Sequence, residues 1–377
     1  MFFTIYLDYA ASSPPFPEVL ELVNRTALEC YANPGALHQA GAAARKILQR
    51  SRVLLAQMMK VRPEEVFFTS GGTEANNWAI RMGADVPGKK HIICSATEHS
   101  SVLEPIRQLE KSGYTITWLN PDRAGRIRLE DLEKAIRRDT ALLCVQAVNN
   151  ETGVLQNIDA LAQIAKKYRV RFFCDAVQSF GHVNQALSKA DLISCSAHKL
   201  GGPRGVGCLI VRMPIIPTPL IHGGGQEFGL RSGTENLPGI AGFALAAQKS
   251  VEQLESEQLR LAHLQALMED GLRKICPNAQ FAGESANRRN ILSCRLPGIS
   301  AEEMVVRLDQ KGICASPGAA CAARSHAPSH VLLAMGYTPQ EASEFVRFSL
   351  GRNTTESDIR EVLEVIQTIY RKAALRT

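Results

Sequence analysis

The chain contains Phe172-Phe173-Cys174-Asp175-Ala176-Val177-Gln178 and, further on, Leu192-Ile193-Ser194-Cys195-Ser196-Ala197-His198-Lys199. Each stretch is a short apolar run that ends in polar residues, which predicts a buried strand with polar groups at its carboxyl end. In a parallel sheet these ends meet at one edge, where ligands bind. Pyridoxal phosphate (PLP) needs a lysine that forms a Schiff base with its aldehyde and an acid that keeps its pyridine nitrogen protonated. Lys199 and Asp175 are candidates for these two roles, although a lysine after a strand is usually a solvated surface residue.

Apolar runs of strand length alternate with amphipathic runs along the first two thirds of the chain. The predicted strands are Val66–Thr69, His91–Cys94, Thr115–Leu119, Ala141–Val145, Arg171–Cys174, Leu192–Ser194 and Cys208–Val211. The predicted helices between them are Asn76–Met82, Ser101–Lys111, Leu129–Arg138 and Leu161–Tyr168. This alternation is typical of βαβ units, so we expect an α/β fold with a mostly parallel seven-stranded sheet covered by helices on both faces.

The length of 377 residues favours two domains, because single cores stop growing below that size. A long helical pattern from Pro238 to Ile275 is interpreted as the connection to a smaller α+β domain. That domain is predicted to contain strands near Ile291–Leu296 and Phe345–Ser349 and helices near Ala301–Leu308 and Glu356–Ala373. We expect a large domain at 15–255 and a small domain at 256–377, with residues 1–14 packing on the small domain.

Composition limits the function classes only mildly. The net charge of +6 is spread over mixed acidic and basic residues, so no direct nucleic-acid binding is expected. The ten cysteines form no CxxC pair, which favours a reducing compartment over a disulfide framework. The N-terminus has no basic region followed by a long apolar stretch, and no run reaches membrane-spanning length. We therefore expect a cytoplasmic protein without membrane contact.

A glycine turn follows the first predicted strand, in Thr69-Ser70-Gly71-Gly72-Thr73-Glu74. Glycines let a backbone approach a ligand closely, and a helix N-terminus offers free N–H groups to a phosphate. Gly72 and Thr73 are thus candidate phosphate ligands, although a plain helix start with a tight turn fits equally well. A P-loop is excluded because no Gly-Lys-Ser/Thr follows, and the dinucleotide GxGxxG pattern is absent from the chain.

Other polar residues also follow predicted strands. His99 could stack on a cofactor ring and exchange protons, although a lone histidine is more often structural. In Asn149-Asn150-Glu151, a side-chain amide could hold the phenolic oxygen of the cofactor, and a simple turn is the alternative. His222-Gly223-Gly224-Gly225 resembles a lipase oxyanion loop, but the chain has no GxSxG. No metal site is predicted, because Pro328 interrupts the helix that a His326–His330 pair would need.

Taken together, these stretches resemble the NifS/IscS group of cysteine desulfurases, which are class-V aminotransferase-like enzymes of PLP fold type I. The resemblance covers essentially the whole chain and lies in motifs that follow one another in order. They are YLDYAA at 6–11, Asn33-Pro34, TSGGTEA at 69–75, TEH at 97–99, VNNETGVLQ at 148–156, DAVQS at 175–179, SAHK at 196–199, HGGGQE at 222–227, RSGTEN at 231–236, GAAC at 318–321 and RFSLGR at 347–352.

The resemblance implies a role for each matching residue. Lys199 would carry PLP and act as base and acid at the substrate α-carbon, Asp175 would pair with the pyridine nitrogen, and His99 would stack on the ring. Gln178 and Asn150 would hold the phenolic oxygen. The implied phosphate ligands are Gly72, Thr73, Ser196 and His198, with Thr234 reaching the cofactor of a neighbouring subunit in a homodimer. Arg347 would bind the substrate carboxylate with help from Asn33.

Cys321 decides the reaction type that the resemblance implies. It lies in Ser316-Pro317-Gly318-Ala319-Ala320-Cys321-Ala322-Ala323, a stretch of small residues typical of an exposed loop. In the family this thiol accepts sulfur from L-cysteine as a persulfide, releases L-alanine and passes the sulfur to an acceptor protein. Here alanines replace the hydroxyl residues that commonly flank the thiol, and Pro317 precedes it. A passive thiol, or one paired with Cys314, is the alternative.

Three functions are therefore compared. The first is a cysteine desulfurase that supplies an iron–sulfur scaffold, a tRNA-thiolating enzyme or a cofactor-biosynthesis carrier. The second is another PLP reaction on the same scaffold, such as selenocysteine lysis or transamination. The third is a non-catalytic sulfur-relay or interaction protein. Since the chain ends soon after its last predicted helix, where some relatives have a longer tail that docks a scaffold, the iron–sulfur scaffold is the less secure acceptor.

Overall fold

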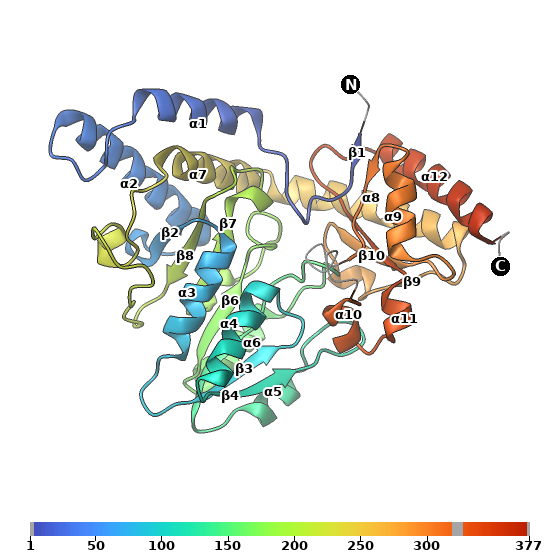
Figure 1. Ribbon diagram of the computed structural model, residues 1–377, viewed down its shortest axis with the longest axis horizontal. Coiled ribbons are helices and arrows are strands. Elements are labelled where there is room, and N and C mark those ends of the chain that lie inside the picture. Colours follow the sequence, from blue (N-terminus) through green and yellow to red (C-terminus); the bar gives the residue numbers. More distant parts are fainter. Residues whose placement is uncertain (1–3, 319–326, 375–377) are drawn as a thin grey trace.

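The computed structural model describes residues 4–318 and 327–374 and has a large α/β body beside a smaller one (Figure 1). The large body is built on a seven-stranded sheet of order β2-β8-β7-β6-β5-β3-β4, in which β8 runs in the direction opposite to the other six strands. The strands are β2 (Val66–Thr69), β3 (His91–Ser95), β4 (Thr115–Leu119), β5 (Thr140–Cys144), β6 (Arg171–Asp175), β7 (Leu192–Ser196) and β8 (Gly207–Val211). The prediction of a mostly parallel seven-stranded sheet is confirmed.

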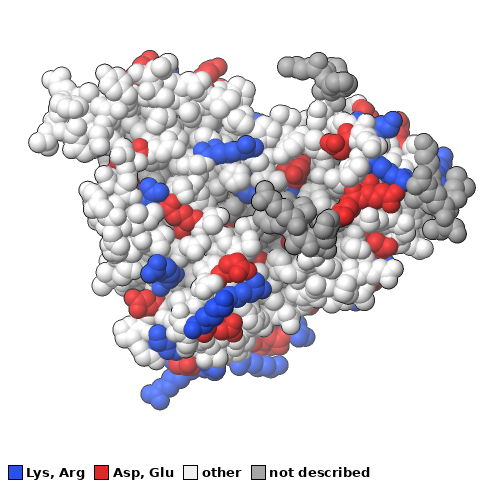
Figure 2. Space-filling model, in the orientation of Figure 1, with Lys and Arg blue, Asp and Glu red and all other residues white. Residues whose placement is uncertain are grey.

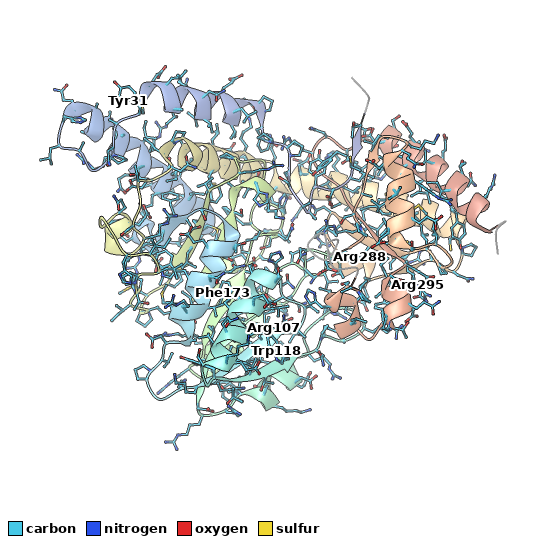
Figure 3. The ribbon with its side chains drawn as sticks, in the orientation of Figure 1. Tyr31, Arg107, Trp118, Phe173, Arg288 and Arg295 are labelled. Atoms are coloured by element: carbon cyan, nitrogen blue, oxygen red, sulfur yellow. The ribbon has the colours of Figure 1, made fainter. Side chains whose placement is uncertain are left out.

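Helices cover both faces of this sheet, because successive strand residues point to opposite sides. Phe172 packs into one apolar cluster, with α1, α2, α6 and α7, while its neighbour Phe173 packs into the other, with α3 and α4 (Figures 1 and 3). The helices are α1 (Pro17–Glu29), α2 (Gln39–Met59), α3 (Gly72–Ala84), α4 (Ser100–Lys111), α5 (Leu129–Ala135), α6 (Ile158–Lys167) and α7 (Leu237–Glu252). Sequence analysis did not identify α1 and α2, and it extended α5 three residues too far.

The smaller body has its own apolar cluster, which includes Leu7 from the N-terminal segment. It contains a sheet of order β12-β10-β9 and a parallel pair of β1 with β11. Its strands are β1 (Ile5–Tyr6), β9 (Gln280–Phe281), β10 (Ile291–Arg295), β11 (Ile313–Cys314) and β12 (Phe345–Ser349). Its helices are α8 (Leu254–Ile275), α9 (Ala301–Asp309), α10 (His330–Ala334), α11 (Pro339–Ala342) and α12 (Glu356–Ala374). We propose domains at 15–255 and 256–377, with residues 1–14 packing on the second.

The single long helix expected from Pro238 to Ile275 is wrong, because two helices meet at Gln253. The backbone of Gln253 (φ −94°, ψ −1°) closes α7, and its N–H bonds back to Lys249 and Val251. The two helices pack in different cores. Helix α7 packs against α1 and α2, whereas α8 packs against α12. The break lets each helix keep its apolar face on its own cluster.

A buried ion pair anchors the loop at residues 222–236 to the large body. The Arg52 guanidinium donates to both carboxylate oxygens of Glu227, at 2.9 and 2.6 Å, and also to the Val66 carbonyl. Glu227 in turn accepts from the Phe68 N–H at 2.8 Å. Both side chains are only 2% exposed, so each charge depends on the other for solvation. Glu227 and Phe228 hold left-handed backbone angles that this pair helps to fix.

Charged side chains of both signs are interspersed over the face in Figure 2. Of the helices in the part of the chain that the structure describes, none is both long and apolar enough to cross a membrane.

Replacing Glu227 by Gln should reduce the free energy of unfolding by about 3–5 kcal/mol, because Arg52 would remain buried without its counter-ion. The matched control is Glu18→Gln, which removes the partner of Lys249 in a solvent-exposed pair and should cost about 1 kcal/mol or less. Urea denaturation followed by circular dichroism measures both. Equal effects for the two variants would contradict the importance of the buried pair.

Candidate active site

A cavity of about 440 Å³ opens where β2 turns into α3. It is lined by residues from four separate segments: Ala11 and Ser12, Ser70–Glu74, Ser196 and His198, and Arg204 and Gly205. The first turn of α3 leaves backbone N–H groups without intrahelical partners, and the helix dipole adds positive character there. Four of the predicted phosphate ligands line this cavity: Gly72, Thr73, Ser196 and His198. The cavity is therefore suited to an anion such as a phosphate.

Gly72 lets α3 approach the end of β6 closely. A Cβ atom at Gly72 would lie 2.7 Å from Cγ2 of Val177, closer than real Cβ contacts. The segment after β6 carries Val177 and Gln178, so this close approach brings the phosphate cradle and the predicted ring-binding residues together. A side chain at Gly72 would push them apart.

Lys199 follows β7 directly, in the short 3₁₀ turn Ala197–Lys199. Its Nζ donates to the carbonyls of Ala10 and Ala11, at 2.6 and 3.0 Å. The Gln178 side-chain amide donates to the same Ala10 carbonyl at 2.8 Å. Lys199 and Gln178 therefore converge on one point of the N-terminal segment, which is compatible with their predicted roles around one cofactor.

Asp175 ends β6 and is almost fully buried. Its Oδ1 accepts from the Val177 N–H at 2.9 Å, and its Oδ2 accepts from Nδ2 of Asn76 at 2.8 Å. Each oxygen keeps capacity for a further donor, as a carboxylate that pairs with a protonated pyridine requires. Asp175 thus ends β6, and Lys199 lies in the turn that follows the neighbouring strand β7.

His99 caps the start of α4, where its Nδ1 accepts from the Ser101 N–H at 3.1 Å. Burial lowers its pKa, and the positive charge of Lys199 adds to this effect, while Asp175 opposes it. His198 has its pKa lowered to about 4, mainly by burial and also by the charges of Lys199 and Arg204. An imidazole with such a pKa is neutral at pH 7, so His198 would meet a phosphate as a neutral donor.

Arg347 lies on β12 and is almost fully buried. Its Nη2 donates to Oδ1 of Asp8 at 2.7 Å and its Nη1 to the Asn150 carbonyl at 3.0 Å. The guanidinium therefore joins the N-terminal segment, the large body and the small body. Asn150 lies in contact with Arg347 through its backbone, so two of the predicted site residues meet here.

Two predicted residues lie elsewhere in the chain. Asn33 is exposed between α1 and α2, with its Oδ1 accepting from the Gly35 N–H at 2.8 Å. Figure 1 shows that this connection is at the opposite end of the molecule from the small body that holds Arg347, so one chain does not bring Asn33 to Arg347. Thr234 is also exposed, in the loop that Glu227 anchors. Cys321 lies outside the described residues, as does His326.

Sequence analysis missed the polar side chains that hold these segments together. Arg231 donates to both oxygens of Glu74, at 2.8 and 3.0 Å, and so ties the Thr234 loop to the first turn of α3. Asn76 contacts Asp175 and Ser101 from inside α3. The sequence offered one signal for Asn76: it lies four residues after Gly72, a spacing that places two residues on the same face of a helix. The Arg231–Glu74 pair joins residues far apart in the chain, and no local pattern indicates it.

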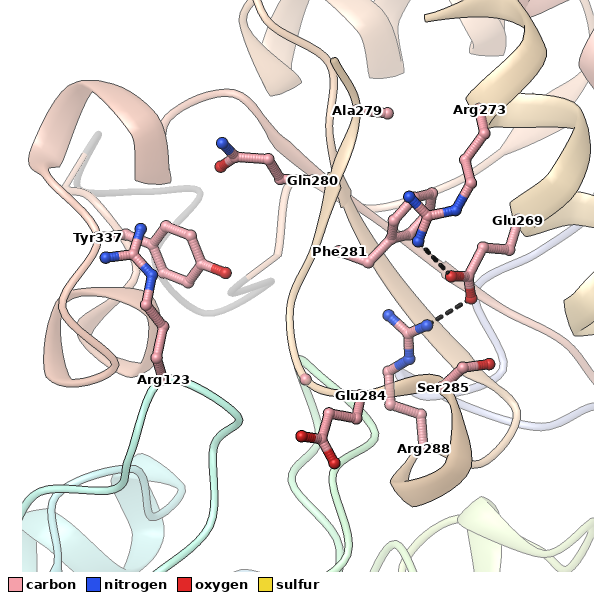
Figure 4. Close-up of a pocket in the computed structure, with 11 residues that line it drawn as sticks. Arg123, Glu269, Arg273, Ala279, Gln280, Phe281, Glu284, Ser285, Arg288 and Tyr337 are labelled. Atoms are coloured by element: carbon pink, nitrogen blue, oxygen red, sulfur yellow. Dashed lines mark hydrogen bonds and ion pairs between the residues drawn. The ribbon is translucent and has the colours of Figure 1, made fainter. Parts of the chain in front are cut away.

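Another pocket, of about 520 Å³, is lined mostly by the small body, with Arg123 from the large body, and is shown in Figure 4. Two of its arginines, Arg273 and Arg288, share the carboxylate of Glu269. Glu284, which also lines it, pairs with Arg126. Neither Lys199 nor the α3 cradle borders this pocket, so its size does not make it the candidate active site.

The Gly72→Ala variant should bind PLP about tenfold more weakly, because a methyl group costs roughly 1–3 kcal/mol where the packing has no room for it. The double variant Gly72→Ala/Val177→Ala removes the opposing Cγ2 and should recover most of that affinity. Titration of the cofactor-free protein with PLP, followed by visible absorbance, measures both. A single variant with unchanged affinity would show that the close approach is unimportant.

The chain is similar to known proteins over nearly its whole length. The family model described as aminotransferase class-V matches residues 5–362. A relative named cysteine desulfurase IscS, from Dictyoglomus turgidum, is 39% identical over 99% of this chain and 95% of its own. A solved NifS-like protein superposes with a TM-score of 0.91 at 34% identity, covering 97% of this chain and 99% of its own. A structure titled SspA in complex with cysteine has a TM-score of 0.80 at 34% identity, over 92% and 99% of the two chains.

Class-V aminotransferases and cysteine desulfurases depend on PLP. The residues described above fit that cofactor, because an amine, a buried carboxylate and an anion cradle lie at one edge of the sheet. The chain belongs to the class-V aminotransferase family and, within it, to the cysteine desulfurases of the NifS/IscS group.

Proposed function

We propose that the protein is a PLP-dependent cysteine desulfurase that converts L-cysteine to L-alanine and passes the sulfur on through Cys321. The observation that carries this proposal is the convergence of Lys199, Asp175 and the α3 cradle at the carboxyl ends of adjacent strands. It is supported by the near full-length likeness to relatives that are named cysteine desulfurases. When bound, PLP supplies an electron sink for the α-carbon of the substrate.

The residues around that position have separate tasks in the proposed reaction. The Arg347 guanidinium binds the substrate carboxylate, for which its planar fork is suited. Lys199 would hold PLP through its Nζ, and the same amine would remove the α-proton of the substrate and return it. His99 would lie against the cofactor ring and, as a neutral imidazole, could donate or accept a proton on the substrate side.

Cys321 is the proposed sulfur acceptor. Its thiolate forms a bond to the substrate sulfur while the Cβ–S bond breaks, and the electron pair of that bond stays with the carbon fragment. That fragment takes up a proton and leaves as L-alanine, and the persulfide on Cys321 carries the sulfur to an acceptor protein. We propose a cytoplasmic iron–sulfur scaffold or thiolation enzyme as this acceptor.

The other cysteines of the described residues are poor competitors for this role. Most are buried in strands, and burial raises the pKa of thiols such as Cys94, Cys174 and Cys195 well above the ordinary value. Cys314 is half-buried, and its pKa is raised by burial and by the carboxylates of Asp309 and Asp8. A thiol with a raised pKa forms little of the reactive thiolate at neutral pH.

The Cys321→Ser variant should keep bound PLP and its yellow colour but lose sulfide and alanine formation by at least about a hundredfold, because it lacks the nucleophile. The control is Cys314→Ser, which removes a half-buried thiol nearby in the sequence and should retain activity. Both products are measured with L-cysteine and a reductant. Full activity in Cys321→Ser would remove that residue from the mechanism, and keto-acid products would point to transamination.

We also propose that the protein is a homodimer in which Thr234 completes the phosphate site of the neighbouring subunit. Large apolar side chains are exposed at the end of α1, on the α1–α2 connection and on the Thr234 loop, namely Leu28, Tyr31, Leu37 and Phe228. Leu37 is 98% exposed, and Figure 3 shows Tyr31 near the end of α1, on the side of the molecule away from the small body. Such residues are typical of a surface that another protein covers. The same interface could bring Asn33 to the partner's Arg347.

Mixing two impaired variants tests whether Thr234 acts across subunits. Thr234→Ala should weaken PLP binding about tenfold, as expected for the loss of one phosphate ligand, and Lys199→Ala should abolish turnover. If Thr234 acts in trans, a mixed dimer contains one complete site, so activity at limiting PLP rises on mixing. Activity that stays at the level of Thr234→Ala alone would assign Thr234 to its own subunit's site.

A further inference from the structure

A continuous chain of side-chain hydrogen bonds connects Asp175 to His99 through two residues that the proposed mechanism does not use. Asn76 Nδ2 donates to Oδ2 of Asp175 and to Oγ of Ser101, both at 2.8 Å. Ser101 Oγ lies 2.7 Å from Nδ1 of His99. Asn76 is 1% exposed and Ser101 8% exposed, so water does not compete strongly for these bonds.

The carboxylate of Asp175 fixes the orientation of the Asn76 amide. A flipped amide would place its oxygen against a carboxylate oxygen, two acceptors without a proton between them. With the amide nitrogen toward Asp175, its oxygen is buried and has no partner among the described residues. An unpaired buried acceptor costs free energy. Asn76 thus gives up one hydrogen bond in order to donate to both Asp175 and Ser101.

The direction of the remaining bonds then follows from proton counting. The Ser101 hydroxyl accepts from Asn76, so its single proton is directed to Nδ1 of His99. The Ser101 N–H also points to Nδ1, at 3.1 Å. With two donors aimed at it, Nδ1 must be an acceptor, and neutral His99 carries its proton on Nε2. Protonation of Nδ1 would place a third donor against these two.

We propose that Ser101 and Asn76 are positioning residues that hold His99 as the neutral Nε2–H tautomer and couple that state to Asp175. Nε2 is then the nitrogen that presents a proton to the cofactor side, while Nδ1 accepts hydrogen bonds from the hydroxyl and the N–H of Ser101. A negative charge on Asp175 keeps the Asn76 amide in place, and the amide keeps the Ser101 hydroxyl turned toward His99. The expected effect on turnover rests on the proposed function, whereas the tautomer of His99 does not.

The charged and titratable groups around His99 are consistent with this assignment. Lys199 and His330 both lower its pKa, after burial, while Asp175 raises it. His330 lies on α10, with its Nε2 2.9 Å from the Glu98 carbonyl next to His99. Glu98 itself is buried, and burial raises its pKa well above the ordinary value. The negative charge of Asp175 raises the pKa of His99 and so opposes its neutral form.

Nitrogen-15 NMR of the histidine-labelled holoenzyme tests the tautomer directly, with His99→Gln identifying the signal. We expect His99 to be neutral and protonated at Nε2 in the wild type at pH 7–8. Removing a donor to Nδ1 favours the imidazolium, so Ser101→Ala and Asn76→Leu should raise the titration midpoint of His99 by roughly half to one pH unit. Ser101→Thr retains the hydroxyl and should restore the wild-type midpoint.

The matched controls are Ser100→Ala, an exposed hydroxyl one residue away, and Asn77→Leu, a neighbouring amide that bonds to the Thr73 carbonyl. Neither should move the midpoint. A wild-type His99 protonated at Nδ1, or variants that titrate like the controls, would overturn the proposal. The acid limb of the pH–rate profile for alanine formation should move with the midpoint. A protein that forms no alanine would refute the desulfurase function, while the NMR result would still decide the tautomer.

Discussion

The site depends on one close approach, that of the α3 N-terminus to the carboxyl ends of β6 and β7. Three glycines allow it. A Cβ at Gly72 would meet Val177, and one at Gly207 would lie 2.5 Å from the Cys195 carbonyl and 2.8 Å from the backbone of Gly71. The backbone of β8 therefore packs directly against the glycine turn. This packing places the anion cradle within one cavity with the strand-end residues Ser196 and His198.

The N-terminal segment joins the two bodies at that site. Its first described residues belong to the small body, where β1 pairs with β11 and Leu7 enters the second core. A few residues later, the carbonyls of Ala10 and Ala11 accept from Lys199 of the large body. Asp8 meets Arg347 between the two. A change that loosened this segment would therefore affect both the lysine and the arginine, although neither is its neighbour in the chain.

Ion pairs and chains of side-chain hydrogen bonds hold the other site residues in position. Glu227 and Arg231 of one loop reach Arg52 on α2 and Glu74 on α3, so the loop that carries Thr234 is attached at two points. Asn76 and Ser101 connect two predicted ring-binding residues on different elements, Asp175 and His99. These contacts explain how side chains on separate strands and loops can hold a common orientation around one cofactor.

The sequence by itself determined the sheet, the positions of its strands and the edge at which the chemistry lies, because apolar runs and the polar residues that end them are local features. Lys199, Asp175 and the glycine turn were identifiable for the same reason. It did not reveal the break at Gln253, since both helices continue one apolar pattern while packing on different cores. Asn76, the Arg231–Glu74 pair and the separation of Asn33 from Arg347 were decided by tertiary structure alone. Each depends on which distant segments the fold brings together, and a local pattern of residue types carries no information about that.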